Sequence, residues 1–230
     1  MKRLAIIGIV ALFFALGTIF EFPGLVSHTD TKIVYQTVKE YVNNTIEIPV
    51  GQIYDKNISV YGIAVFNESG GGELVKITML MRAGSGGLLL DVTDKTFGAD
   101  FQDSLLIIKD YVESYTGTSL AYKDIILKLD THAESIGGAS GSAVIGIGLI
   151  AMLKNISLKQ NTVVTGVLQP DGTLAPVSAL DAKIDVAKSS GVTELLIPKV
   201  QCASVNESQK IGITVTCVNT INEALGRMSA

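Results

Sequence analysis

The spacing of apolar and polar residues divides the chain into strands and helices in an irregular order. The stretch "ISVYGIAVF" is rich in β-branched and aromatic residues, which predicts a strand, and "ESGGG" after it predicts a turn. The next stretch, "ELVKITMLM", alternates apolar and polar residues, so we expect the two strands to form a hairpin. Residues 99–115 then predict an amphipathic helix ended by Gly117. Its apolar positions recur at steps of three and four residues: Phe101, Leu105, Ile108, Val112 and Tyr115.

The second half of the chain also mixes strands with helices. The stretch "DIILKLDT" predicts a strand, and the apolar run of residues 143–153 predicts a buried helix, because it is too short to span a membrane. The stretch "NTVVTGVLQPDGTLAPV" reads as strand, Pro-Asp-Gly turn and strand. A helix closed by Gly191 and the strands "ELLIP" and "GITVTCV" follow. Since this order lacks the steady rhythm of a doubly wound sheet, we expect an α+β domain of mixed sheets with packed helices.

The N-terminus carries a candidate membrane segment. Lys2 and Arg3 precede a charge-free run over residues 4–20, whose length is at the lower edge of a membrane span. We expect an uncleaved signal anchor, and a cleaved signal peptide is the alternative, although "LGTIFEFPG" offers no convincing cleavage site. The positive charges predict a cytoplasmic N-terminus, with the rest of the chain outside the cell membrane. The expected organisation is a cytoplasmic stub and transmembrane anchor (1–23), a juxtamembrane connector (24–56) and a folded domain (57–230).

Composition limits the size of the core and the class of partner. The chain has 230 residues, of which 47% are hydrophobic and 17% charged, so it can bury one sizeable core. The net charge of −4 supplies no basic field to attract a phosphate backbone. We therefore expect no nucleic-acid partner.

Two weaker features agree with a location outside the cytoplasm. Cys202 and Cys217 flank a short polar segment, and in an oxidising compartment a disulfide there would contribute about 3 kcal/mol of stability. Two reduced cysteines are the alternative. We expect no metal site, because two cysteines and two distant histidines do not form a ligand cluster. Five asparagines begin an N-x-[ST] glycosylation acceptor: Asn43, Asn57, Asn67, Asn155 and Asn206.

A glycine-rich loop places Ser140 directly before the predicted buried helix, in "AESIGGASGSAVIGIGLIAML". The start of such a helix points backbone N–H groups at the loop, which suits a developing oxyanion. A histidine base for Ser140 is poorly supported, because His28 follows the candidate anchor and His132 is typical of a surface position. The loop also misses the nucleophile-elbow pattern, and the other glycine clusters lack the ending of a phosphate loop.

A neutral lysine is another base that could activate a serine. Burial favours the neutral amine, but moving the lysine pKa from about 10.4 to near 7 requires roughly 4 to 5 kcal/mol. Lys183 is the best candidate, because Leu180 and Ile184 mark the adjoining helix face as buried. The alternative is that Lys183 only lays its aliphatic stem along that face and keeps its amine in water.

Three stretches of the chain resemble the proteolytic domain of Lon proteases, especially the archaeal membrane-associated branch. They are "YGIAVFNESGGGELVKITMLM", "YTGTSLAYKDIILKLDTHAESIGGAS" and "TGVLQPDGTLAPVSALDAKIDVAKSSGVTELLIPK". The third is similar to the most specific block of the family. The resemblance implies that Ser140 is the nucleophile and Lys183, 43 residues later, the general base. It also implies that the hydroxyl of Thr165 helps to orient the lysine.

The chain departs from the family pattern at two places. Family members usually carry Pro-Ser-Ala-Gly or Asp-Ser-Ala-Ser at the nucleophile, whereas this chain has Ala-Ser-Gly-Ser over residues 139–142. The paired glycines that precede the lysine helix in the family appear here as Ser178 and Ala179. The chain also contains no phosphate-loop sequence, so we expect no ATPase domain and no cofactor.

The resemblance implies a membrane-anchored, ATP-independent serine endopeptidase in which residues 57–230 form a Lon-like protease domain. Its expected substrates are peptide bonds in unfolded or flexible polypeptides, hydrolysed by a Ser-Lys dyad. Lon proteolytic domains assemble into rings, so the resemblance suggests a hexamer, and a monomer or smaller oligomer is the alternative. Two other functions stay open: a catalytically inactive interaction module on the outer face of the membrane, and a hydrolase of small amides or esters that uses the same dyad.

Overall fold

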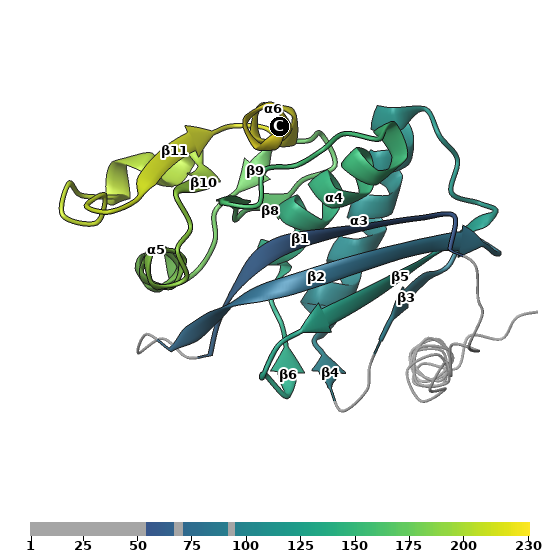
Figure 1. The fold of residues 1–230 in the computed structure, drawn as a ribbon, viewed down its shortest axis with the longest axis horizontal. Coiled ribbons are helices and arrows are strands. Elements are labelled where there is room, and N and C mark those ends of the chain that lie inside the picture. Colours follow the sequence, from purple (N-terminus) through teal and green to yellow (C-terminus); the bar gives the residue numbers. More distant parts are fainter. Residues whose placement is uncertain (1–53, 67–70, 92–94) are drawn as a thin grey trace, which may run out of the picture. The chain divides into compact units, whose positions relative to one another are not determined.

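A computed structural model describes residues 54–66, 71–91 and 95–230. Within this part of the chain, no helix is both long and apolar enough to cross a membrane. The predicted transmembrane anchor (1–23), and all of the connector (24–56) except its last three residues, lie outside the described residues. The described residues form the α+β arrangement of mixed sheets and packed helices that the sequence predicts (Figure 1).

The larger sheet has four strands in the order β1-β2-β5-β3. Their bounds are Lys56–Val65 for β1, Gly72–Ala83 for β2, Leu88–Leu90 for β3 and Lys123–Asp130 for β5. β1 and β2 form the predicted antiparallel hairpin, and β2 also pairs antiparallel with β5, while β3 joins β5 in parallel. The buried positions of β2 alternate (Val75, Ile77, Met79 and Met81), so one face of this sheet is turned toward the core.

Helices α3 and α4 cover that face (Figure 1). α3 (Ala99–Thr116) ends at Gly117 in the left-handed conformation, as predicted. α4 (Ser142–Lys154) is the predicted buried helix, and eleven of its residues are buried, from Ser142 to Met152. A Cβ atom at Gly148 would lie 2.1 Å from Met79 Cε, so the glycine allows α4 to approach the sheet closely.

The C-terminal part forms a smaller, parallel sheet in the order β11-β10-β7. Its strands are β7 (Thr162–Val164), β10 (Glu194–Pro198) and β11 (Thr214–Val218), and α5 (Leu180–Ser189) lies between β7 and β10 in the chain. The remaining elements are short: β4 (Thr96–Phe97), β6 (Ser135–Ile136), β8 (Val167–Leu168), β9 (Leu174–Ala175), the 3-10 helices η1 (Ala139–Gly141) and η2 (Lys199–Ser204), and α6 (Ile221–Met228). β4 pairs with β6 in parallel, and β8 pairs antiparallel with β9 across the predicted turn.

Two hydrophobic clusters stabilise these two sheets. The larger cluster joins the β1-β2-β5-β3 sheet to α3, α4 and α6, and it also includes Val164, Leu196 and Val218 of the parallel sheet. The smaller cluster packs α5 against the parallel sheet, with Ile184, Leu195 and Ile197 fully buried at its centre. Ile63 of β1 belongs to the smaller cluster, so the β1–β2 hairpin contacts both.

A disulfide joins Cys202 of η2 to Cys217 of β11, with 6.0 Å between the Cα atoms. It closes a loop of 15 residues, which corresponds to about 3 kcal/mol of stabilisation through restriction of the unfolded chain. The reduced alternative is therefore not the state of these cysteines in the structure.

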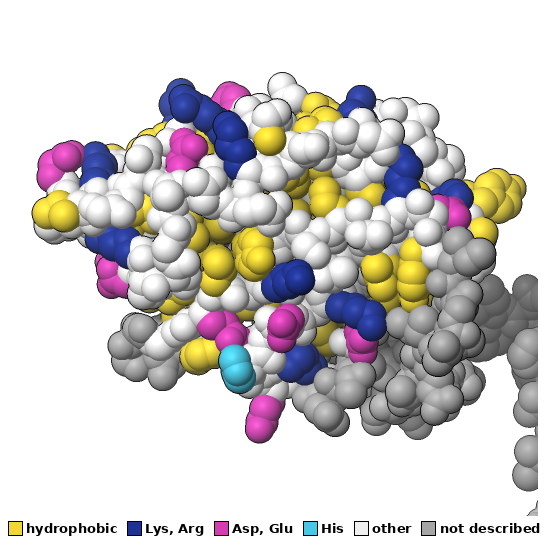
Figure 2. Space-filling view, in the orientation of Figure 1, with side chains coloured by type: hydrophobic (Ala, Val, Ile, Leu, Met, Phe, Trp, Pro, Cys, Tyr) yellow, Lys and Arg dark blue, Asp and Glu magenta, His cyan; other side chains and the backbone are white. Residues whose placement is uncertain are grey.

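Charged side chains of both signs are interspersed over the face of the molecule shown in Figure 2, and that face carries no broad patch of positive charge. This agrees with the net charge of −4. A nucleic-acid backbone would find no extended basic surface there.

Candidate active site

The loop that carries Ser140 is fixed at both ends by backbone hydrogen bonds. Before Ser140, β6 pairs with β4, and the N–H of Gly138 donates to Asp100 Oδ2 at 2.7 Å. Gly138 has a φ of 81°, a left-handed value that favours glycine. Ser140 follows in the single 3-10 turn η1, immediately before α4.

The segment Thr165–Leu168 holds the other end of the loop. The N–H of Gly166 donates to the carbonyl oxygen of Ser140 at 3.0 Å, and the N–H of Ala143 donates to the carbonyl oxygen of Gly166 at 3.3 Å. The hydroxyl of Ser142, only 1% exposed, accepts from the N–H of Leu168 at 2.8 Å and donates to Gly166 O at 3.4 Å. These bonds fix the backbone of Ser140 from the side of β8.

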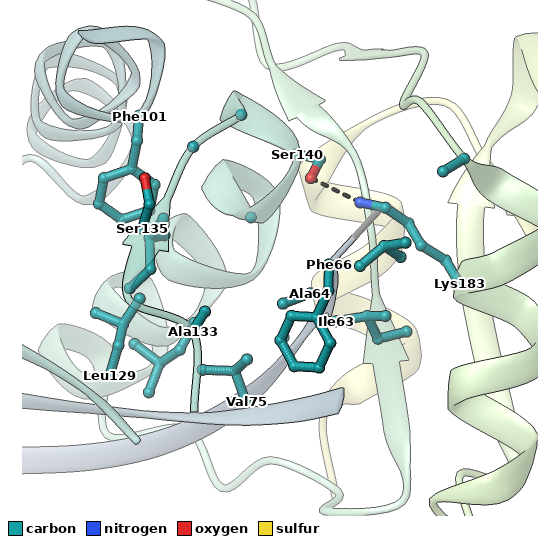
Figure 3. Close-up of a pocket in the computed structure, with 18 of the residues that line it drawn as sticks. Ile63, Ala64, Phe66, Val75, Phe101, Leu129, Ala133, Ser135, Ser140 and Lys183 are labelled. Atoms are coloured by element: carbon teal, nitrogen blue, oxygen red, sulfur yellow. Dashed lines mark hydrogen bonds between the residues drawn. The ribbon is translucent and has the colours of Figure 1, made fainter. Parts of the chain in front are cut away.

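Lys183 reaches Ser140 from the facing helix α5. Its Nζ lies 2.6 Å from Ser140 Oγ and 3.3 Å from Thr165 Oγ1, and Figure 3 shows the side chain pointing at the serine hydroxyl. The structure therefore brings together all three residues that the resemblance singled out. Their catalytic roles stay predictions at this point.

Burial controls the charge of Lys183. The residue is 4% exposed, and its neighbours on α5 include the buried Leu180 and Ile184. This burial lowers the pKa of Lys183 from its ordinary 10.5 to about 8. The alternative in which Lys183 keeps its amine in water is wrong, because the amine faces the serine inside the protein.

A cavity of about 740 Å³ opens beside the Ser140–Lys183 pair. Its walls come from the ends of β1 and β2, from α3 and α4, and from the loop before Ser140 (Figure 3). Most of its lining residues are apolar, and the charged ones are Glu134 and Lys183. Phe66, half exposed at the end of β1, lies on the same side of the cavity as Ile63 and Lys183.

Other chemistries find little support among the described residues. His132 is paired with Glu73, with 2.7 Å between Nδ1 and Oε2, and its side chain is 95% exposed. His28 lies outside the described residues. No group of three histidine, cysteine or acidic side chains in the described part of the chain is arranged to hold a metal ion.

Three residues that shape this site were not predicted from the sequence. Asp100 holds Gly138, Ser142 connects α4 to β8, and Ala179, with a φ of 50°, directly precedes the lysine helix. A serine at the start of a helix is a common capping residue, so the pattern at Ser142 gave no sign of its contact with Leu168. Only the family's paired glycines at positions 178 and 179 pointed to an unusual backbone conformation before α5.

Comparisons with known proteins place the chain in one family. Residues 32–228 match the family model of the Lon protease (S16) C-terminal proteolytic domain. An Archaeal Lon protease from Methanocaldococcus jannaschii is 27% identical over 172 residues, which cover 71% of this chain and 26% of that protein.

Two further relatives extend the comparison. An Archaeal Lon protease from Thermococcus kodakarensis is 26% identical over 191 residues, covering 80% of this chain and 30% of that protein. A Lon protease from Borrelia duttonii is 28% identical over 206 residues, covering 83% of this chain and 25% of that protein. The chain thus spans about a quarter of the length of the curated relatives it matches. Since the family model covers most of its residues, the chain belongs to the Lon protease C-terminal proteolytic domain family.

Proposed function

We propose that the protein is a serine peptidase that cleaves peptide bonds with Ser140 as nucleophile and Lys183 as general base. The observation that carries this proposal is the 2.6 Å contact between Lys183 Nζ and Ser140 Oγ. Membership of the Lon proteolytic family supports it. The adjacent cavity leaves space for a substrate at the serine hydroxyl.

The reaction begins with proton transfer from the serine hydroxyl to the neutral amine. With a pKa of about 8, a useful fraction of Lys183 is neutral near neutral pH, whereas a lysine at its ordinary pKa would be almost fully charged. Ser140 Oγ attacks the peptide carbonyl, and Lys183 then donates its new proton to the leaving amine. Water, deprotonated by the same lysine, hydrolyses the acyl-enzyme and regenerates the serine. Thr165 keeps the amine in place through its hydroxyl, 3.3 Å from Nζ.

The start of α4 supplies the electrostatic environment for the developing oxyanion. α4 begins two residues after Ser140, so the positive end of its dipole faces the serine. The N–H groups of Gly138, Ser142 and Ala143 already donate to Asp100, Ala139 and Gly166. The oxyanion donors are therefore expected between these residues, on the backbone of Ser140 and Gly141.

The proposed substrates are unfolded or flexible polypeptides, cleaved without ATP. An open cavity of about 740 Å³ accommodates several residues of an extended chain but no folded domain. The relatives are named as Lon proteases, which supports a polypeptide substrate. The chain contains no phosphate-loop sequence, which supports cleavage that needs no nucleotide.

The test is cleavage of casein and of unstructured peptides by the purified 230-residue chain in the absence of nucleotide. Ser140→Ala and Lys183→Met should each abolish cleavage. Ser190→Ala and Lys188→Met, at the far end of the lysine helix, serve as matched controls and should cleave at the rate of the unmodified chain. Equal cleavage by Ser140→Ala and the unmodified chain would refute the assignment.

An inactive interaction module is the competing function, and the altered Ala-Ser-Gly-Ser sequence at the nucleophile motivates it. A fluorophosphonate probe distinguishes the two, because it reacts covalently only with an activated serine. Labelling at Ser140, located by mass spectrometry, supports the peptidase. A chain that is unreactive in every oligomeric state supports the inactive module. A small amide or ester that outcompetes peptides would support a small-molecule hydrolase instead.

We also propose that the protein is anchored in the cell membrane with its protease domain outside the cytoplasm. The charge-free run after Lys2 and Arg3 supports an anchor, and the Cys202–Cys217 disulfide supports an oxidising compartment. Protease protection of intact cells compared with lysed cells would test the location, and sedimentation of the full chain would show whether it forms a hexameric ring or a smaller species.

A further inference from the structure

The position of Lys183 depends on how α5 begins. Ala179, the residue before the helix, has left-handed backbone angles (φ 50°, ψ 41°), and its carbonyl oxygen accepts the N–H of Lys183 itself at 3.1 Å. Ser178 and Ala179 also line the active-site cavity. A change in the direction of residues 177–179 would therefore move the first turn of α5, and the lysine with it.

The side-chain amide of Gln201, in η2, forms hydrogen bonds with both the N–H and the carbonyl group of Val177. The N–H of Val177 donates to Gln201 Oε1 at 2.8 Å, and Gln201 Nε2 donates to the carbonyl oxygen of Val177 at 2.8 Å. Two bonds to one residue fix its orientation as well as its distance, as a neighbouring strand would. Val177 is 6% exposed, so its polar groups have little access to water that could replace these bonds.

The segment that contains Gln201 is covalently linked to the parallel sheet. The next residue, Cys202, forms the disulfide with Cys217 of β11. Further along, Gln209 Nε2 donates to Asp181 Oδ1 at 2.6 Å, which gives the first turn of α5 a second connection to the same segment. Residues 201–209 therefore fix the position of the start of α5 through hydrogen bonds that lie outside the active site.

We propose that Gln201 is a positioning residue for the general base: through Val177 it holds the start of α5 so that Lys183 stays buried against Ser140. The inference rests on the proposed function, since it assigns Gln201 a role in the reaction of that same pair. Gln201 does not touch the reacting atoms, and its effect passes through the backbone of residues 177–179.

The consequence is measurable as a change in the pH at which Ser140 becomes reactive. Burial lowers the pKa of Lys183 to about 8, and a displaced α5 would admit water to the amine and bring this pKa back toward its ordinary value. Burial is the only cause of the lowered pKa, and the nearby carboxylates do not contribute to it: Glu134 lines the cavity, and Asp181 and Asp185 of α5 are exposed. A loss of positioning should therefore move the reactivity profile toward higher pH, whereas a loss of folded protein would lower the amplitude without moving it.

The experiment measures the rate of fluorophosphonate labelling of Ser140 between pH 6 and 10, in the full chain. Gln201→Met keeps the size of the side chain and removes both hydrogen bonds. We expect its half-maximal pH to rise by about one unit, which corresponds to roughly tenfold slower labelling at pH 7 with recovery near pH 10. Gln201→Glu keeps the acceptor for the Val177 N–H and loses the donor, so a smaller rise is expected. This variant tests the proposal even if Gln201→Met does not fold.

Two matched controls separate positioning from general stability. Gln160→Met changes an exposed glutamine remote from α5 and should keep the unmodified profile. Reduction of the Cys202–Cys217 disulfide should move the profile in the same direction as Gln201→Met, by less. An unshifted profile in folded Gln201→Met and Gln201→Glu would overturn this inference alone. A natural chain that is never labelled would overturn the proposed function, and the role of Gln201 with it.

Discussion

The two halves of the active site are held by different physical means. Ser140 belongs to the half built on the β1-β2-β5-β3 sheet, and backbone hydrogen bonds to Gly166 together with the neighbouring contacts of Gly138 and Ser142 fix its loop. Lys183 belongs to the half built on the parallel sheet, and its amine is held by apolar burial and two hydroxyl contacts. Ser140 is thus positioned by directional hydrogen bonds, whereas exclusion of water lowers the pKa of Lys183. Substitutions near Ser140 should therefore change the geometry of its loop, and substitutions near Lys183 should change the charge of its amine.

The largest expected effect follows from removing the base. Lys183→Met should reduce cleavage about a thousandfold or more, because the serine loses its proton acceptor. The same variant should be more stable than the unmodified chain at pH 7, by up to about 3 kcal/mol, since a buried ammonium group is replaced by an apolar side chain of similar length. Urea unfolding at pH 7, with Lys188→Met as a less buried counterpart on the same helix, measures this difference. A destabilised Lys183→Met would show that the contacts of the amine stabilise the fold by more than its burial costs.

The pH dependence of stability and of labelling in the unmodified chain also tests the half that carries Lys183. Lys183 has a pKa of about 8 in the folded protein and 10.5 when exposed, so between these values the unfolded chain binds more protons than the folded one. The free energy of unfolding should therefore rise with pH from about 8 to 10.5, before the titration of other groups intervenes. Labelling of Ser140 should rise between about pH 7 and about pH 9 and reach half its maximum near pH 8. In Lys183→Met the rise in stability should be absent, which urea unfolding across this range would reveal.

Ser142→Ala tests the half that contains Ser140, which depends on hydrogen bonds. The change leaves the buried N–H of Leu168 without its acceptor, which should cost about 1 to 3 kcal/mol of stability. Since Ser142 also helps to fix the loop of Ser140, we expect labelling at saturating pH to fall without any change in half-maximal pH. A shifted half-maximal pH would contradict the separation of geometry from charge. Ser119→Ala, at an exposed serine, is the control.

The smallest expected effect concerns the backbone before α5. Ala179 has a φ of 50°, a conformation that glycine adopts without strain, so Ala179→Gly should increase stability by up to about 1 kcal/mol. Labelling of Ser140 should keep its pH profile, because α5 begins in the same place. Thermal unfolding measures the gain. A loss of stability would indicate that packing of the Ala179 methyl group stabilises the fold by more than the left-handed backbone conformation of Ala179 destabilises it.

The local elements could be predicted from the sequence, and several long-range contacts could not. The β1–β2 hairpin, α3 and α4 follow from periodicity that each segment carries alone. The meeting of Ser140 and Lys183 was indicated only by the family resemblance, since the residues are 43 positions apart and lie in different halves. The hydrogen bonds between Gln201 and Val177 could not be predicted from the sequence, because a glutamine within a short 3-10 helix is ordinary at the surface. The parallel pairing of β7, β10 and β11 likewise depends on tertiary contacts that short strands do not encode.

Ser140 directly precedes α4, a helix of the larger hydrophobic cluster, whereas Lys183 lies on α5, a helix of the smaller one, so their contact connects the two clusters. Under the proposed function, a displacement of α5 alone would separate the two side chains and stop the reaction.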